Sequence, residues 1–435
     1  MHDFTEHLQN LLSDYRKNGM PINVNFRALV DINNFDRLTH YIHSYPAKLL
    51  QCIPIYFIRN RILSSSDSLI YDPFCGSGTV ALESLSHGQN SYNRDVNPFA
   101  SLLTSVKCTY IDEEKIISTL GVINRNTRKI TPINHNILNQ DFWYDKRVYG
   151  ELSKTIQAIN EISDEAIANF FKVSFSSTAR KMSYADPRIS VPVKLKPEKY
   201  PAGHKLRVAA EKTIKEISPE NVSKVFNRIS IANAKRLSSI GGQLSGSLQV
   251  DLENAQSPPS PELFEKVDLI ITSPPYPGAQ KYIRASSMSL LWLNLHTGCL
   301  TPLKKRVIGR EEVALSEYTG QSGCRNADEQ IALIAQKDRE RAAIAESYLR
   351  EMSNVFKSCW MFLKKDGYLV TVTANNLFRG IEFYTQKHLC KLAEDEGFQL
   401  ELELIDDIKS YGLMTKRNKT AGVISREVVS VFKKR

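Results

Sequence analysis

The sequence contains no run of about 18 apolar residues, and its start, MHDFTEHLQNLL, lacks the basic stretch and apolar segment of a secretory signal. We therefore expect neither a membrane-spanning helix nor export. The seven cysteines form no CxxC pair, and no histidine lies near them at zinc-ligand spacing. The sequence thus predicts neither a disulfide framework nor a metal site, and we expect a soluble protein of the reducing cytoplasm.

Internal repeats and low-complexity tracts are also absent, and acidic residues are in the minority among the charged ones. The 435 residues include 57 Lys and Arg against 47 Asp and Glu, which gives a formal net charge of +10 and an isoelectric point near 9.1. This balance suits a partner that carries phosphates, although ribosomal and membrane-surface proteins share it. The length and the 42% of hydrophobic residues allow one large domain and a second, smaller one.

Alternating strands and helices are predicted in two separate parts of the chain. The first part has an apolar strand ending at Asp72, a glycine turn with a helix, a strand over 91–96, and a helix through Val106. The second part opens with the apolar strand of KVDLIITSPPYPG, residues 266–278. It continues with a helix near 338–363, a strand at 368–374, a helix near 383–396, and strands near 399–405 and 427–432. Such alternation predicts an α/β fold with a mostly parallel sheet covered on both faces.

Between about residues 110 and 240 the alternation stops. We expect helix over 146–175, an irregular stretch punctuated by prolines, and helix again before residue 240. From 170 to 240 the chain has 15 Lys and Arg but only 5 Asp and Glu, an excess of ten positive charges. The rest of the chain is close to neutral. The sequence therefore predicts a basic, mostly helical insert between the two alternating parts.

The glycine turn DPFCGSGT has the features of a nucleoside-binding loop. Gly76 and Gly78 let a ligand approach the backbone at a helix start, and Asp95 follows the next strand, where such folds bind ribose hydroxyls. The turn lacks the Gly-Lys-Ser/Thr ending of a phosphate loop and the third glycine of a dinucleotide fingerprint. A nucleoside without phosphates fits this combination, so we predict S-adenosylmethionine as the cofactor. An ordinary turn, with Asp95 as a solvated acid or a helix cap, is the alternative.

The proline turn Thr272-Ser273-Pro274-Pro275-Tyr276 suits methylation of an exocyclic amine on a base. The lone pair of such a nitrogen is delocalised into the ring, so the site must aim hydrogen-bond acceptors at the two amino hydrogens. The turn can present the Ser273 hydroxyl and the Pro274 carbonyl as acceptors. Tyr276 offers a flat face on which an extruded base can stack. A rigid turn with a half-buried tyrosine is the alternative.

Together the two turns resemble the motifs of the DNA amino-methyltransferases. DPFCGSGT resembles the cofactor motif of that family, and TSPPY resembles its catalytic motif, in which Ser is usual in the cytosine-N4 branch. Weaker likenesses support these two. HSYPAK at 43–48 resembles the N-terminal motif around the methionine end of the cofactor, and Asp95-Val96-Asn97-Pro98 resembles the acidic motif. Val250-Asp251 resembles the motif near the adenine ring, and RNKTAGVISREVVSVFKK at 417–434 resembles the last strand. The resemblance covers about 40–110 and 245–435.

The resemblance implies a class I methyltransferase fold, with a Rossmann-like, mostly parallel seven-stranded sheet and helices on both faces. It places the catalytic domain in 1–110 and 241–435 and leaves 111–240 as a DNA-recognition region. It implies methyl transfer from S-adenosylmethionine to N4 of a flipped cytosine in double-stranded DNA, as in restriction-modification systems. A cognate restriction endonuclease is a further candidate partner. The recognised DNA sequence and the oligomeric state do not follow from the residues.

Three sets of site residues follow. The catalytic set is Ser273, Pro274, Pro275 and Tyr276. The cofactor-binding set is Pro46, Ala47, Lys48, Asp72, Phe74, Gly76, Gly78, Thr79, Asp95, Asn97 and Asp251. The DNA-binding set is Lys281, Tyr282 and Arg284 after the catalytic turn, with Arg180, Lys181, Arg188, Lys194 and Lys196 in the proline-rich part of the insert.

Other activities stay open at this point. Serine in the catalytic motif also occurs in some adenine-N6 enzymes, and tRNA amino-methyltransferases carry a similar glycine turn, although their catalytic turn usually begins with Asp or Asn. A DNA-binding module that keeps the fold without catalysis is a further alternative. Cytosine-C5 methylation is disfavoured because it needs a nucleophilic cysteine after a proline, whereas Cys75 lies inside the glycine turn. The long insert also leaves the motif-order class of the enzyme open.

Overall fold

The computed structural model describes residues 3–30, 32, 37–278, 281–407 and 426–435. In this part of the chain eight strands form one sheet in the order β1-β9-β10-β6-β5-β2-β3-β4, and all neighbours are parallel except that β10 is antiparallel to β6 and β9. The strands are β1 (Ile22–Asn23), β2 (Leu69–Asp72), β3 (Asn90–Arg94), β4 (Leu248–Asp251), β5 (Val267–Thr272), β6 (Leu363–Thr373), β9 (Phe398–Asp407) and β10 (Arg426–Lys434). β7 (Asn376–Phe378) and β8 (Ile381–Phe383) form a separate hairpin. The predicted Rossmann-like α/β fold is thus confirmed, with one short strand more than the seven expected.

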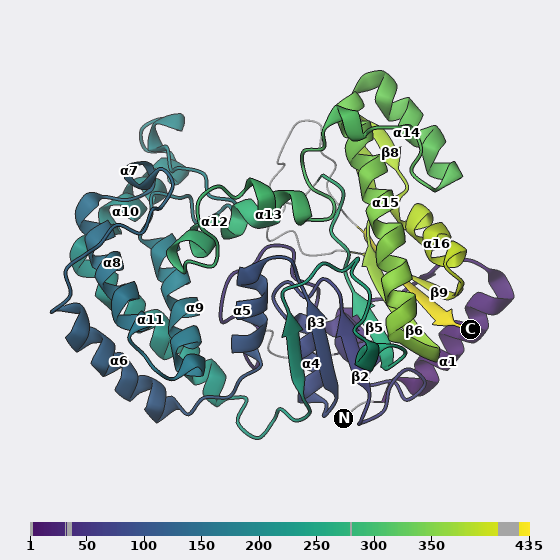
Figure 1. Cartoon of the computed structure of the whole chain (residues 1–435), viewed down its shortest axis with the longest axis horizontal. Coiled ribbons are helices and arrows are strands. Elements are labelled where there is room, and N and C mark those ends of the chain that lie inside the picture. The colour runs from purple at the N-terminus through teal and green to yellow at the C-terminus, as the bar shows by residue number, and fades with distance from the viewer. Residues whose placement is uncertain (1–2, 31, 33–36, 279–280, 408–425) are drawn as a thin grey trace.

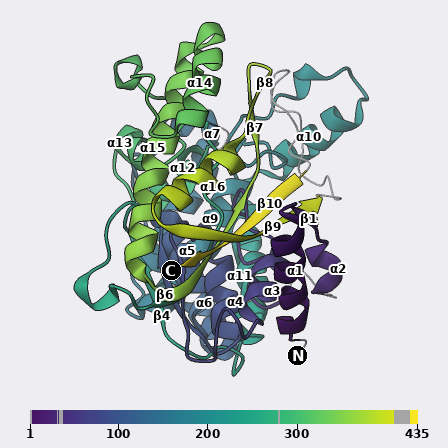
Figure 2. The same cartoon turned by 90° about the vertical axis from the view of Figure 1, so that its right-hand side faces the viewer.

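Helices cover both faces of this sheet because its strands are apolar on both sides. Successive side chains of a strand point to opposite faces, and accordingly Ile271 belongs to one core and Ile270 to another. The first core contains residues of α1 (Thr5–Asn18), α3 (Cys52–Ile58) and α4 (Thr79–Ser86). The second contains residues of α14 (Arg325–Lys337), α15 (Arg339–Phe362) and α16 (Thr385–Asp395). Figure 2 shows α1 and α15 on opposite sides of the sheet.

The insert is a bundle of helices, three of which begin at an aspartate cap. Asp112, Asp145 and Asp164 each accept hydrogen bonds from backbone N–H groups of the first helical turn, which would otherwise have no partner. The helices are α6 (Glu113–Thr127), α7 (Gln140–Trp143), α8 (Lys146–Asn160), α9 (Glu165–Lys181), α10 (Lys205–Glu216) and α11 (Pro219–Ser238). Figure 1 shows them beside the sheet, on the far side from α15.

A third core joins this bundle to α5 (Pro98–Lys107), which follows Asp95-Val96-Asn97, and to α12 (Tyr282–Trp292), which follows the proline turn. It contains Phe170 and Phe175 of α9, Leu103 of α5 and Trp292 of α12. The indole Nε1 of Trp292 donates to the Tyr144 hydroxyl at 2.9 Å. The remaining helical elements are α2 (Phe26–Leu29), α13 (Thr301–Arg306) and short 3-10 turns at Pro197–Lys199, Pro261–Leu263 and Leu315–Glu317. The insert therefore packs directly against α5 and α12, which start at the pocket described next.

Among the described helices none combines the length and the apolar character needed to cross a membrane.

Candidate active site

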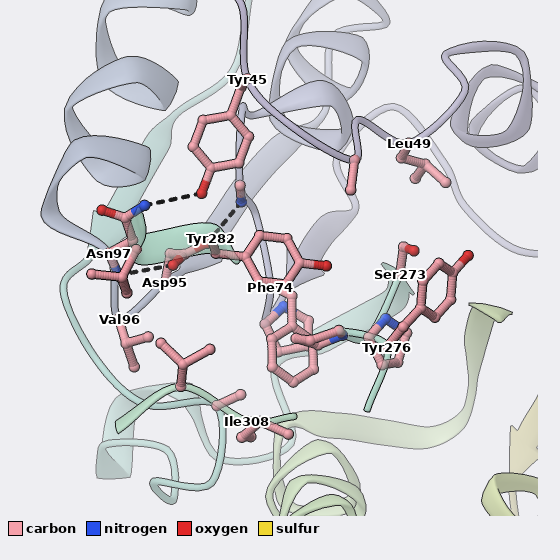
Figure 3. Close-up of a pocket in the computed structure, with 18 of the residues that line it drawn as sticks. Tyr45, Leu49, Phe74, Asp95, Val96, Asn97, Ser273, Tyr276, Tyr282 and Ile308 are labelled. Atoms are coloured by element: carbon pink, nitrogen blue, oxygen red, sulfur yellow. Dashed lines mark hydrogen bonds between the residues drawn. The ribbon is translucent and has the colours of Figure 1, made fainter. Parts of the chain in front are cut away.

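A pocket lies where β2, β3 and β5 end, at the carboxyl edge of the parallel strands where α/β folds bind ligands. Both predicted motif turns line it, although about 200 residues separate them in the sequence. Figure 3 shows Asp95, Val96 and Asn97 on one side of Phe74, and Ser273 with Tyr276 on the other. The lining residues are Tyr45, Ala47, Lys48, Leu49, Pro73, Phe74, Gly76, Asp95, Val96, Asn97, Asn254, Ala255, Ser273, Pro274, Pro275, Tyr276, Tyr282, Ile283, Arg306, Val307, Ile308 and Glu427.

The two glycines of the first turn are needed for different reasons. Both have left-handed backbones, with φ of +50° at Gly76 and +68° at Gly78. Gly76 lines the pocket, and a Cβ there would have Tyr45 at an ordinary 3.4 Å. A Cβ on Gly78 would lie 2.8 Å from the Thr104 side chain and 3.0 Å from its Cα. Gly76 therefore opens the backbone to the pocket, whereas Gly78 lets α5 pack closely against the start of α4.

The Asp95 carboxylate lines the pocket and is fixed by the backbone. Its Oδ2 accepts from the Gly76 N–H at 2.9 Å and its Oδ1 from the Asn97 N–H at 2.8 Å. Burial raises the pKa of Asp95 to about 6, and these hydrogen bonds oppose the rise. Each oxygen keeps a second lone pair, so the group can still accept from a ligand hydroxyl.

Asp72 does not line the pocket but joins the two turns from behind. Its carboxylate accepts from the Thr272 hydroxyl at 2.7 Å and from the Phe74 N–H at 3.0 Å. Burial raises the pKa of Asp72 to about 7. Since Asp72 ends β2 and Thr272 ends β5, the contact fixes the spacing between the glycine turn and the catalytic turn.

The N-terminal segment closes one wall of the pocket through Tyr45, Ala47, Lys48 and Leu49, without Pro46. The Lys48 ammonium donates to the backbone carbonyls of His40 and His43 at 2.9 and 2.8 Å. The Tyr45 hydroxyl accepts from Asn97 Nδ2 at 3.1 Å. Lys48 therefore uses two of its donors to hold the segment in place.

All four predicted catalytic residues, Ser273 to Tyr276, line the pocket. The Tyr276 hydroxyl donates to Glu427 Oε1 at 3.4 Å, and burial holds the pKa of Tyr276 well above its usual value. The residues after the turn are tied to the loop beyond α13, since the Gly278 N–H donates to the Gly309 carbonyl at 3.0 Å. The turn is thus held from both sides.

Several pocket residues were not among the predicted site residues. Tyr45, Leu49, Pro73, Val96 and Ile283 are sequence neighbours of predicted ones, and three further groups come from other segments. Asn254 and Ala255 follow β4, and Asn254 Nδ2 donates to the Arg306 carbonyl at 3.3 Å. Residues 306–308 come from the segment after α13, which carries no motif. Glu427 lies on β10. A sequence signal existed for Glu427, because it lies within the match to the last strand at 417–434.

Several predicted cofactor residues lie beside the pocket rather than on its wall. Thr79 is buried in the first turn of α4 next to Gly78. Asp251 ends β4, where its carboxylate accepts from the Tyr92 hydroxyl at 2.6 Å. Of the match to the last strand, residues 417–425 fall outside the described residues. The binding roles assigned to all these residues remain predictions.

Most of the predicted DNA-binding cations already have partners within the chain. Lys281 pairs with Glu311 at 2.7 Å, and Arg188 pairs with Asp186 at 2.6 Å. Arg180 donates to the carbonyls of Asp186 and Ile189, and burial lowers its pKa. The Lys194 ammonium lies 4.5 Å from the ring centre of Phe142 and 5.2 Å from that of Tyr184. Lys181, Lys196 and Arg284 are exposed, whereas Tyr282 lines the pocket.

Comparison with known proteins gives one extended match. The chain is 25% identical to the type II methyltransferase M.MvaI of Kocuria varians over 415 residues, which cover 88% of this chain and 86% of that protein. It is also 30% identical to the type II methyltransferase M.MjaII of Methanocaldococcus jannaschii, over 92 residues that cover 21% and 17% of the two chains. No family model matches the chain.

Solved structures align over most of their length but with low scores. A SAM-dependent methyltransferase from Methanosarcina mazei gives a TM-score of 0.31 at 11% identity, covering 86% of this chain and 94% of its own. The rRNA methyltransferase aviRa of Streptomyces viridochromogenes also gives 0.31, at 12% identity, covering 94% and 96%. These scores are too low to support an argument about chemistry. The extended sequence match therefore stands as the main finding: this chain is homologous to the type II methyltransferase M.MvaI.

Proposed function

We propose that this protein is a DNA methyltransferase that uses S-adenosylmethionine to methylate the N4 amino group of cytosine. The main observation behind the proposal is that both turns line one pocket, with Asp95 on one side of Phe74 and Ser273 and Tyr276 on the other (Figure 3). The first side suits a phosphate-free nucleoside, and the second suits a stacked base with an amino group. The match to M.MvaI, a type II methyltransferase, supports methyl transfer in a restriction-modification setting.

The residues of the pocket fit S-adenosylmethionine. Asp95 presents a backbone-fixed carboxylate to ribose hydroxyls, and Val96, Ile308 and Phe74 offer apolar surface to an adenine ring. Gly76 leaves its side of the turn open to the ligand. The Lys48 donors are engaged with backbone carbonyls, so no phosphate is needed to satisfy them. When bound, the cofactor supplies an electrophilic methyl group.

The catalytic turn prepares the amino nitrogen to accept that methyl group. The Ser273 hydroxyl and the Pro274 carbonyl accept hydrogen bonds from the two amino hydrogens, which directs the nitrogen lone pair away from the ring. Tyr276 stacks on the base and holds its plane. The product amine releases its proton to solvent after transfer, and we assign no residue as a general base.

Double-stranded DNA is the proposed partner, and a base must leave the duplex to reach the turn. Exposed cations that can meet phosphates beside it are Lys181 and Lys196 of the insert and Arg284 of α12. Figure 1 shows α12 and α13 between the insert and the upper part of the sheet, with α7 and α10 at the upper left, at the top of the insert. We therefore propose that the insert holds the duplex over the pocket. A restriction endonuclease of the same specificity is the proposed biological partner.

Cysteine-dependent C5 methylation is not supported by the environment of Cys75. Its thiol is buried, Thr104 donates to its sulfur at 3.6 Å, and burial raises its pKa well above the usual value. Adenine N6 methylation is the second candidate, since an adenine amino group poses the same chemical problem to the same turn.

Transfer of a radiolabelled methyl group from S-adenosylmethionine tests the enzyme class. We expect label in duplex DNA and none in tRNA, and Ser273→Ala should lower the rate by about tenfold, the equivalent of one hydrogen bond of about 1.4 kcal/mol. Ser287→Ala is the matched control, since Ser287 lies on α12 outside the pocket and donates to the Arg284 carbonyl. Label in tRNA alone would assign an RNA enzyme, and no transfer would indicate a binding module.

A further inference from the structure

Glu427 is a pocket carboxyl that the proposed chemistry has not used. It lies near the start of β10, directly opposite Asp406 of β9, so the two side chains share one face of the sheet. Its Oε1 accepts from the Tyr276 hydroxyl at 3.4 Å. The Tyr276 side chain therefore reaches from the catalytic turn, which begins at Ser273, to Glu427.

On balance, the surroundings of Glu427 raise its pKa. Burial raises its pKa, the negative charge of Asp406 raises it further, and Arg27 of α2 and the Tyr276 hydrogen bond oppose this. A guanidinium nitrogen of Arg27 also lies 3.8 Å from Asp406 Oδ2, so its positive charge acts on both acids. Among the described residues, Cys52 of α3 also lies near Arg27 and Asp406, and burial raises the pKa of its thiol to about 11. Tyr282 and Tyr348 are the further titratable groups near Tyr276.

Ser273, Tyr276 and Glu427 line the same pocket. A base that stacks on Tyr276 with its amino group at Ser273 can therefore place the rest of its Watson–Crick edge at Glu427. In cytosine the amino group is followed by two acceptors, N3 and O2, whereas in adenine it is followed by one acceptor, N1, and a C–H group. An ionised carboxylate would repel the cytosine edge, but a protonated carboxyl can donate to it.

We propose that Glu427 donates a hydrogen bond to the acceptor edge of the extruded base and thereby favours cytosine over adenine. The proposal rests on the proposed function and names the residue that sets its base preference. The Tyr276 hydroxyl occupies Oε1, and Oε2 carries the proton that the base accepts. The proton is directed at O2 of cytosine, the position at which adenine carries a C–H group, and a site built to donate to an acceptor discriminates against a base that lacks it.

Substitution of Glu427 tests the donor role directly. Glu427→Gln keeps a hydrogen-bond donor of similar shape, so kcat/KM on cytosine should fall no more than about threefold. Glu427→Ala should lower kcat/KM by about 10- to 100-fold, which is the effect of removing one or two hydrogen bonds. The Ala variant should change adenine methylation much less, with duplexes that differ only in the target base. Asp407→Asn is the matched control, because Asp407 is a neighbouring acid at the exposed end of β9, paired with Arg426 at 2.8 Å. Cofactor affinity, measured by calorimetry, should be the parent's in all three.

The pH profile separates a donor from a merely structural carboxyl. A protonated Glu427 donates only below its pKa, so parental kcat/KM on cytosine should fall as the pH rises through that pKa, and Glu427→Gln should remove this limb. An identical profile in the Gln variant, or equal losses with Gln and Ala, would overturn the proposal.

Measurements in the Tyr276→Phe background test whether Glu427 acts only through its hydrogen bond with the Tyr276 hydroxyl. A direct donor keeps its effect there, so Glu427→Ala should still lower activity on cytosine by at least about tenfold, whereas no further loss would overturn the proposal. Failure of the proposed function has a different signature, because the parent itself would then not produce N4-methylated cytosine.

Discussion

Replacing Gly78 with alanine should destabilise the fold without removing any contact to the cofactor. The new Cβ would need a left-handed backbone, which costs about 1–2 kcal/mol for an L-residue. It would also lie 2.8 Å from the Thr104 side chain and 3.0 Å from its Cα, and such overpacking costs about 1–3 kcal/mol. We therefore expect a loss of about 2–5 kcal/mol in the free energy of unfolding.

Urea denaturation followed by circular dichroism measures this loss. With an unfolding entropy of roughly 2.1 cal/mol/K per residue, the same change corresponds to a fall in Tm of roughly 2–5 °C for a chain of this length. Gly76→Ala is the matched comparison. It carries similar backbone strain but meets only an ordinary contact of 3.4 Å with Tyr45, so it should cost less stability and more cofactor affinity. Parental stability for Gly78→Ala together with reduced cofactor affinity would refute the assignment of the two glycines.

Three other predictions concern the pocket and the insert. Asp95→Ala should weaken S-adenosylmethionine binding in calorimetry far more than DNA binding. The affinity of the parent for S-adenosylmethionine should decline as the pH falls through about 6, where Asp95 becomes protonated. Unchanged cofactor affinity in the variant would leave Asp95 as a support of the turn only. Tyr276→Phe should keep most activity, whereas Tyr276→Ala should lose about 1–3 kcal/mol of base binding, and equal activity of the Ala variant and the parent would remove the stacking role. Replacing Lys181 and Lys196 by alanine should flatten the salt dependence of DNA binding by about 0.9 in log–log slope for each phosphate that the variant no longer neutralises. Lys194→Ala should change the slope less, because its ammonium lies over two aromatic rings; a larger change for Lys194 would contradict this ranking.

The sequence was sufficient for the central strands and for both motif turns, because their signals are local. An apolar strand that ends at a glycine or proline turn predicts a site at a sheet edge without knowledge of distant contacts. The helix expected over 146–175 was interrupted in the structure, since Asp164 caps a new helix, α9. β1 escaped prediction because two residues, Ile22 and Asn23, carry no periodic pattern and form a strand only by pairing with β9.

The rest of the site depends on long-range packing that no local pattern encodes. Residues 306–308 reach the pocket because Gly278 and Asn254 bond to their segment, and neither contact leaves a trace in the sequence. The charge of the insert was counted correctly, but a count cannot show which cations have partners. Arg188 and Arg180 meet Asp186 and nearby carbonyls within a few residues of the chain.

Mass spectrometry of nucleosides tests the central claim most directly. Duplex DNA that contains the recognised site would be incubated with the protein and S-adenosylmethionine, digested to nucleosides and compared with DNA treated with Ser273→Ala. We expect N4-methyldeoxycytidine in the first sample and much less in the second. N6-methyldeoxyadenosine as the sole product would contradict the base assignment, and the absence of any methylated nucleoside would contradict the proposed reaction itself.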